Sequence, residues 1–202
     1  MAVVSTPGHR NGTRLVLASS SPRRRQLLAM VGACFEVDPP AVDETFPAGL
    51  SPEQGAVALA CAKADQVARR RPDDVVVGAD TLVVLDGDVL GKPRDADEAR
   101  RMLQRLSGRT HQVWTGLAVR HRSGGRSAEG AECTRVTFRE LDPGEIERYV
   151  ALGEGMDKAG AYAVQGVGAI FVVRIEGCYY NVVGLPLARL ASMLRPFGVR
   201  LW

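Results

Sequence analysis

The stretch Leu15-Val16-Leu17-Ala18-Ser19-Ser20-Ser21-Pro22-Arg23-Arg24-Arg25 decides the start of the fold. Its four apolar residues predict a short buried strand, and its three serines predict a turn. Pro22 is typical of the first position of a helix, and Gly32 predicts where that helix ends. We therefore expect a strand, a turn and a helix in direct succession.

The first turn of this helix is basic, although a helix N-terminus carries about half a positive charge and unpaired N–H groups. The helices predicted to begin at Asp95 and Asp142 open with acidic residues instead. Each of Arg23, Arg24 and Arg25 costs about 0.3–1 kcal/mol there if it faces solvent. A bound phosphate would remove the conflict; the alternative is a surface helix that tolerates its arginines. If phosphate binds, Arg24→Ala is expected to weaken triphosphate binding and to leave stability unchanged or slightly raised.

The rest of the chain alternates strands and helices and then turns to hairpins. Further helices are predicted at 51–70, 95–107, 142–153 and 186–194, and strands at 75–78, 81–85, 89–90, 113–120 and 135–138. Segments 170–175 and 179–183 are predicted to form a hairpin that turns at Glu176-Gly177. This order predicts an α/β fold, a mixed β-sheet with flanking helices. Residues 1–13 are expected to be a flexible N-terminal tail, and 14–202 a single domain.

Composition excludes several classes of protein. The 202 residues include 26 basic and 23 acidic ones, a net charge of +3 that is too balanced for a nucleic-acid coat. No apolar run is long enough to cross a bilayer. The isolated cysteines suit reduced core thiols of a cytosolic protein; they are Cys34, Cys61, Cys133 and Cys178.

Two charged residues fall where the pattern predicts burial. Lys63 lies at the edge of the apolar face of the helix 51–70, where it either extends to solvent or points into a cleft and meets a phosphate. Asp80 follows the strand 75–78, and a carboxylate at the end of a buried strand is costly unless it is paired or binds a ligand. A satisfied turn residue is the alternative for Asp80.

Three more charges lie in predicted loops: Asp43 and Glu44 between prolines, and Lys92 after the strand 89–90. Each alone suits an ordinary loop. Taken with Lys63 and Asp80, the carboxylates and cations suit a site for phosphates and a divalent metal, because such ions prefer carboxylate, phosphate and water oxygens.

A set of short motifs then occurs in one order along the chain. They are Ser19-Ser20-Ser21-Pro22-Arg23-Arg24, Asp43-Glu44, Lys63-Ala64, Gly78-Ala79-Asp80-Thr81, Gly91-Lys92-Pro93, Asp157-Lys158-Ala159-Gly160-Ala161-Tyr162, Gln165-Gly166 and Asn181-Val182-Val183-Gly184-Leu185-Pro186. In these motifs the chain, over 15–194, resembles the Maf family of nucleoside triphosphate pyrophosphatases, also called septum formation inhibitors.

The resemblance implies hydrolysis of a nucleoside triphosphate to the monophosphate and pyrophosphate. It implies two lobes around a deep cleft, an architecture related to the inosine triphosphate pyrophosphatases, together with a divalent cation (Mg²⁺ or Mn²⁺), a homodimer and a cytoplasmic location. No nucleic-acid or membrane partner is expected. A non-catalytic nucleotide-binding regulator of cell division and septum formation is the alternative.

The resemblance also implies roles for individual residues. Asp80 takes the place of the family's proton acceptor, and Glu44 and Asp80 would hold the metal or its water. Residues that match the cleft of the family are Ser19, Arg24, Glu44, Lys63, Asp80 and Lys92. The positions of Arg23, Thr81 and Gln165 match the subfamily that acts on dTTP and UTP.

Gln165 has a chemical reason to contact the base. One amide offers a donor and an acceptor, which suits the N3–H and carbonyl groups of uracil and thymine. Gly160, Gly166 and Gly168 would let the backbone approach that base. The alternative is that Gln165 only braces a glycine-rich loop.

Overall fold

The computed structural model describes residues 14–202, so the predicted tail 1–13 lies outside the described residues. The helices and strands follow one another as β1 (Leu15–Ala18), α1 (Pro22–Met30), β2 (Glu36–Val37), α2 (Pro52–Arg70), β3 (Val75–Leu85), β4 (Asp88–Leu90), α3 (Ala96–Leu106), β5 (Thr110–His121), β6 (Arg126–Phe138), α4 (Pro143–Ala151), β7 (Val172–Glu176), α5 (Tyr179–Val183) and α6 (Leu187–Leu194). Short 3₁₀ helices occupy Ala159–Ala161, Val167–Phe171 and Arg195–Phe197.

Seven strands within residues 14–202 form one mixed sheet, in the order β2-β1-β3-β5-β6-β7 with β4 also paired to β3. Strand β1 is parallel to β2 and to β3, whereas the other pairs are antiparallel. The expected mixed α/β fold is confirmed. The division into two lobes and the single domain 14–202 stay predictions.

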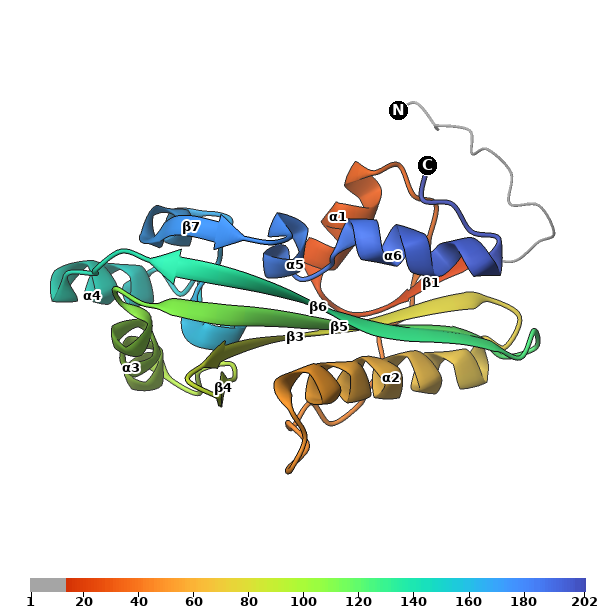
Figure 1. Cartoon of the computed structure of the whole chain (residues 1–202), viewed down its shortest axis with the longest axis horizontal. Coiled ribbons are helices and arrows are strands. Elements are labelled where there is room, and N and C mark those ends of the chain that lie inside the picture. The colour runs from red at the N-terminus through yellow and green to blue at the C-terminus, as the bar shows by residue number, and fades with distance from the viewer. Residues whose placement is uncertain (1–13) are drawn as a thin grey trace.

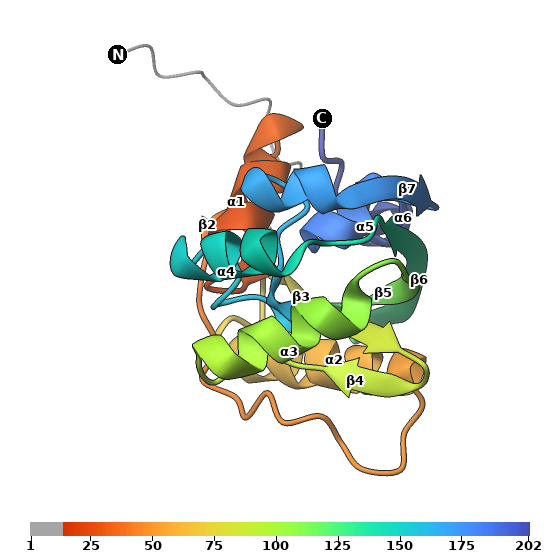
Figure 2. The same cartoon turned by 90° about the vertical axis from the view of Figure 1, so that its left-hand side faces the viewer.

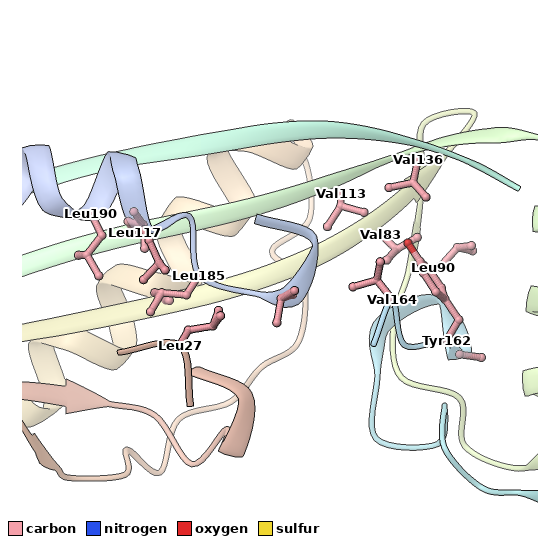
Figure 3. Close-up of a cluster of buried hydrophobic side chains, with 14 of the residues drawn as sticks. Leu27, Val83, Leu90, Val113, Leu117, Val136, Tyr162, Val164, Leu185 and Leu190 are labelled. Carbon is pink, nitrogen blue, oxygen red and sulfur yellow. The ribbon is translucent and has the colours of Figure 1, made fainter. Parts of the chain in front are cut away.

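The sheet has helices on both faces. Helix α2 lies along one side of the long strands β3, β5 and β6, and α1, α5 and α6 lie on the other (Figure 1). The strands alternate accordingly, because successive side chains point to opposite faces. Val76 packs with Ala60 and Ala64 of α2, whereas Val75 and Val77 belong to the larger core on the other face. In that larger core, Leu27 of α1 and Leu190 of α6 lie close to Leu117 of β5 (Figure 3).

One edge of β3 is paired at its two ends but not in between. Strand β1 pairs with residues 75–78 and β4 with residues 83–85, while β5 takes the opposite edge along residues 76–84. Residues 79–82 therefore have no ladder partner on the β1 and β4 side within the described chain. Both β1 and β4 run toward this gap, so the segments that follow their last residues, Ala18 and Leu90, meet there.

Two strand glycines let α2 approach the sheet closely beside this gap. A Cβ atom on Gly78 would lie 2.3 Å from the carbonyl oxygen of Ala60, and one on Gly116 would lie 2.1 Å from that of Ala56. Such contacts are far shorter than side-chain atoms tolerate, so only glycine allows this spacing. Asp80 lies two residues after Gly78 and opposite Gly116 in β5, on the same face as α2.

Gly78→Ala is expected to destabilise the protein by about 1–3 kcal/mol, because the added carbon must push back a helix backbone rather than a flexible side chain. Turnover should fall as well, by up to about 100-fold, since α2 carries Lys63, one of the predicted site residues. Urea unfolding and steady-state kinetics check both effects.

Gly130→Ala in β6 is the matched control for this prediction, because its added carbon would meet only atoms of flexible side chains, Arg189 Nη1 at 3.0 Å and Met193 Sδ at 3.9 Å. A change within about 0.5 kcal/mol is expected there. Equal effects of the two substitutions would contradict the close-approach explanation.

The structure corrects two predicted strands. Asp80 does not end a strand: β3 is continuous from Val75 to Leu85 because β5 pairs with it through the Gly78-Ala79-Asp80-Thr81 segment. The predicted hairpin is wrong, since Tyr179–Val183 is the helix α5. Its Asn181 side chain is fully buried and donates hydrogen bonds to Val113 O and Thr134 Oγ1, which outweigh the strand preference of the aromatic and β-branched residues.

Composition predicted core thiols and no membrane-spanning segment. The cysteines are not core thiols, because Cys34 is exposed and the other three are half-buried. No helix among residues 14–202 has the length and apolar character needed to cross a membrane.

Candidate active site

A pocket of about 660 Å³ lies at the gap in the β3 edge. Its walls include Gly91, which follows β4, and Gly184, which follows α5. The structure places all the predicted site residues on the walls of this pocket: Ser19, Arg23, Arg24, Glu44, Lys63, Asp80, Thr81, Lys92 and Gln165. The geometry thus brings them together, and their roles stay predictions.

Lys63 and Asp80 form the buried centre of the pocket. The Lys63 Nζ atom lies 2.6 Å from Asp80 Oδ1, and the two residues are only 4 % and 7 % exposed. The alternative in which Lys63 extends to solvent is therefore wrong, and so is the alternative of Asp80 as a turn residue. A buried ion pair of this kind is held in one geometry, because either charge alone would be costly to bury.

Glu44 extends this pair toward the surface. The long loop between β2 and α2 (Figure 2) carries Glu44, whose carboxylate bonds Lys63 Nζ at 2.6 Å and Lys92 Nζ at 2.8 Å. Partial burial alone would raise the pKa of Glu44, but the hydrogen bonds from the two lysines outweigh it and lower the pKa to about 2. Charges of alternating sign thus run from Asp80 through Lys63 and Glu44 to Lys92.

Arg24 is buried and its side chain is hydrogen-bonded to the protein, which its position at a helix N-terminus did not predict. Its guanidinium donates to Gly184 O at 2.9 Å, to Thr81 Oγ1 at 3.1 Å and to Ser19 Oγ at 3.3 Å. Burial lowers the pKa of Arg24 below its ordinary value. The contacts now predict that Arg24→Ala lowers stability, in contrast to the expectation from the sequence, because the substitution would remove three hydrogen bonds at a site that is 9 % exposed.

Thr115 supports Arg24 indirectly, through a hydrogen bond to Thr81. The sequence did not predict Thr115 as part of the site. Thr81 Oγ1 and Thr115 Oγ1 are 2.9 Å apart, and Thr115 Oγ1 donates to Asn181 O at 3.2 Å. Since Arg24 donates to Thr81, the hydroxyls form a chain with one consistent direction of donation. The available signal was a polar residue inside the otherwise apolar part of the strand 113–119.

Ser21 and Ser19 shape the turn before α1. Ser21 Oγ caps the helix by accepting from Arg24 N at 3.5 Å, and Ser19 Oγ accepts from Ser21 N at 3.2 Å. Arg23 is half-buried at the pocket wall, whereas Arg25 is exposed. The three arginines therefore have three different environments.

Tyr162 and His111 form a buried aromatic pair beside the part of the pocket wall that carries Gln165. Tyr162 lines the pocket, and its hydroxyl lies 2.8 Å from His111 Nε2. His111 is 1 % exposed and its Nδ1 has no hydrogen-bond partner within residues 14–202. Burial lowers the pKa of His111 from 6.5 to about 4.

This pKa predicts a loss of stability in mild acid. The unfolded chain binds the His111 proton near pH 6.5 and the folded chain only near pH 4, so stability present above pH 6.5 is lost as the pH falls toward 4. Between pH 7 and 5 the wild type should lose about 2 kcal/mol more than His111→Phe. Urea unfolding at the two pH values measures the difference, and parallel losses would contradict a buried neutral histidine.

The pocket also fits the donor chemistry of a divalent metal. Magnesium usually takes one or two carboxylates together with substrate phosphates and water, rather than a cage made by the protein. Glu44 and Asp80 supply two carboxylates around Lys63, and no cluster of three or more His, Cys, Asp or Glu occurs in the described part of the chain. The residues therefore suit a metal that arrives with a phosphorylated ligand.

The fold and the pocket define an α/β protein with cations and carboxylates gathered in one pocket at an edge of its sheet. The family model described as Maf-like protein matches residues 14–197, so the chain belongs to the Maf-like family.

Relatives match along nearly the whole chain. The dTTP/UTP pyrophosphatase of Pelotomaculum thermopropionicum is 55 % identical over 91 % of this chain and 96 % of its own. The protein of the same name from Moorella thermoacetica is 53 % identical over 94 % and 98 %. Among solved structures, the Staphylococcus aureus Ham1 protein has a TM-score of 0.44 and 14 % identity over 62 % of this chain and 72 % of its own, too partial a likeness to assign a function.

Proposed function

We propose that this protein is a nucleoside triphosphate pyrophosphatase that hydrolyses dTTP and UTP to the monophosphate and pyrophosphate. The observation that carries the proposal is the convergence of Arg24, Lys63, Lys92 and two carboxylates on one pocket at the open edge of β3. The names of relatives that are about 50 % identical support the same activity.

In the proposed reaction, water attacks the α-phosphorus and the bond from that phosphorus to the α–β bridging oxygen breaks. Asp80 accepts a proton from the water as the new P–O bond forms, and pyrophosphate leaves with the bridging oxygen. Lys63 fixes the Asp80 carboxylate through the 2.6 Å ion pair. Charge neutralisation and positioning supply most of the rate in phosphoryl transfer, which suits a pocket rich in cations.

Lys92 and Arg23 are the cations with freedom to meet the phosphates. Lys92 is 59 % exposed, and Arg23 lines the pocket near Ser20 and Ser21. Arg24 is largely occupied by Gly184 and Thr81, so we assign it to holding the shape of the phosphate site as well as its charge.

Glu44 and Asp80 would hold the divalent cation. When bound, Mg²⁺ or Mn²⁺ would lower the pKa of the attacking water and neutralise charge on the phosphates. Both carboxylates bind Lys63, so the lysine keeps them in place before the metal and nucleotide arrive.

Release of pyrophosphate tests this proposal. Purified protein is incubated with Mg²⁺ or Mn²⁺ and each of dTTP, UTP, CTP, ATP and GTP, and products are separated by ion-exchange chromatography. We expect monophosphate and pyrophosphate in equal amounts, with dTTP and UTP turned over fastest. Nucleoside diphosphate with inorganic phosphate, or a preference for purines, would contradict it.

A non-catalytic regulator of cell division is not favoured, because the relatives are named as pyrophosphatases. It would bind nucleotide in the same assay and release no product. We also propose a cytoplasmic homodimer, as the resemblance implies. Exposed apolar side chains on and beside the edge strand β7, such as Ile170 and Val173, support a self-association surface, which light scattering can test.

A further inference from the structure

Gln165 is placed by its backbone rather than by its own side chain. It is exposed, lines the pocket, and its side chain has no hydrogen-bond partner within residues 14–202. An amide in this state is available to a ligand, but its direction then depends entirely on how the segment around it is fixed.

Tyr149 and Glu154 fix that segment on both sides of Gln165. On the N-terminal side, Ala163 N donates to the Tyr149 hydroxyl at 3.0 Å. On the C-terminal side, Val167 N and Gly168 N donate to the two carboxylate oxygens of Glu154, each at 3.0 Å.

The two anchoring side chains are joined to each other. The Tyr149 hydroxyl donates to Glu154 Oε1 at 3.0 Å, so both ends of the segment attach to one connected pair. Burial alone would raise the pKa of Glu154, but the backbone donors Gly168 and Val167 outweigh it and lower the pKa below its ordinary value. The carboxylate is therefore the form that holds the segment.

The glycines beside Gln165 serve this attachment. A Cβ atom on Gly166 would lie 2.5 Å from Glu154 Oε2, and Gly166 also has φ +96°. A Cβ atom on Gly168 would lie 2.5 Å from Ala163 O and 2.9 Å from the Tyr149 hydroxyl. These glycines thus let the backbone approach Tyr149 and Glu154, whereas the sequence had indicated an approach to the nucleotide base.

The residues just before Gln165 are fixed by packing as well. Tyr162 and Val164 point into the core beside Val83 and Leu90 (Figure 3). The backbone N–H of Gly160 donates to Gly91 O at 3.1 Å, next to Lys92. Gln165 therefore projects from a segment with fixed positions at 160, 162–164 and 167–168.

We propose that Tyr149 and Glu154 are positioning residues that aim the Gln165 amide and thereby set selectivity for the pyrimidine base. The inference rests on the proposed function, because it assigns the source of base selectivity at the same pocket. Neither side chain lines the pocket, so each acts through the backbone of residues 163–168.

The test separates recognition of the base from recognition of phosphate. Binding of α,β-methylene-dTTP and of inorganic tripolyphosphate, a probe without a base, is measured by calorimetry for wild type, Tyr149→Phe and Glu154→Gln. Tyr149→Phe keeps the ring that packs on Phe171 and removes only the hydroxyl. Each variant should bind the dTTP analogue about tenfold more weakly, because a misdirected Gln165 amide would lose about one hydrogen bond to the base. Tripolyphosphate binding should change less than about twofold.

Kinetics supplies a second measurement. The ratio of kcat/KM for dTTP to that for ATP should fall about tenfold in both variants. The matched controls are Tyr179→Phe, which removes a hydroxyl from an exposed tyrosine, and Glu98→Gln, which changes a carboxylate that binds Arg94 N at the start of α3. Both controls should keep the wild-type ratio.

The outcomes distinguish the two proposals. If the wild type binds the dTTP analogue no better than tripolyphosphate, pyrimidine recognition itself fails and the inference falls with it. If the wild type is selective and the variants keep that selectivity, only the inference is overturned. Equal weakening of both probes would also overturn it, since the two residues would then support the pocket as a whole rather than the aim of Gln165.

Discussion

Asp80→Asn should lower turnover of dTTP by about 10²–10⁴, the scale for losing a general base, while the protein stays folded. Asparagine has nearly the same shape, and its carbonyl oxygen can still accept the hydrogen bond that Lys63 Nζ makes to Oδ1 at 2.6 Å. What it lacks is a second carboxylate oxygen that can take a proton from water. Single-turnover kinetics with saturating nucleotide and metal measures the chemical step alone.

Because Asp80 is also a candidate metal ligand, the metal dependence separates the two roles. If raising the Mn²⁺ concentration restores turnover, Asp80 acts through metal binding rather than as a base. Near-normal turnover at ordinary metal concentration would remove it from the mechanism. Calorimetry with α,β-methylene-dTTP supplies the control that the variant still binds nucleotide.

Lys63→Met should cost both stability and turnover. Lys63 Nζ contacts Asp80 and Glu44 at 2.6 Å each, and its side chain is 5 % exposed. Removing one partner of a buried ion pair costs about 3–5 kcal/mol, because the remaining charge is left without compensation. Turnover should fall by at least about 100-fold, since the Asp80 carboxylate loses the contact that orients it. Urea unfolding and steady-state kinetics measure the two effects.

Lys92→Met is the matched comparison, because it removes a lysine that contacts the same Glu44 but is 59 % exposed. Its stability should change by no more than about 1 kcal/mol, as is usual for exposed ion pairs. Binding of tripolyphosphate should weaken in this variant. A stability loss as large as that of Lys63→Met would show that burial is not what separates the two lysines.

Local signals predicted the α-helices other than α5, because the atoms that begin a helix are close in sequence, and α5 has no side-chain cap. Ser51 and Gln54 form the expected capping box before α2, and Pro22 occupies the first turn of α1. The same holds for α3, which Asp95 caps through Glu98 N. Helices whose ends are fixed by residues close in sequence could thus be predicted from the sequence alone.

Contacts between distant residues were not predictable in the same way. The pairing of Lys63 with Asp80 depends on how closely α2 approaches β3, which Gly78 permits and which no local pattern reveals. Gly78 and Asp80 suggested a strand end, although the partner strand β5 keeps this segment extended. The burial of Arg24 depends on Gly184 O, 160 residues away. Charge patterns and motifs predicted which residues belong to the candidate site, whereas their arrangement depends on the sheet.

The gap in β3 has a further consequence for the behaviour of the protein in a crowded cell. Unpaired strand edges invite a foreign strand to add on, which leads to aggregation. On this edge of β3 in the described chain, the unpaired stretch is residues 79–82, a length of about 13 Å at the usual rise per residue. Strands β1 and β4 occupy both ends of this edge, so an added peptide could form too few backbone hydrogen bonds for stable pairing. The opening is thus too short for strand pairing with another polypeptide.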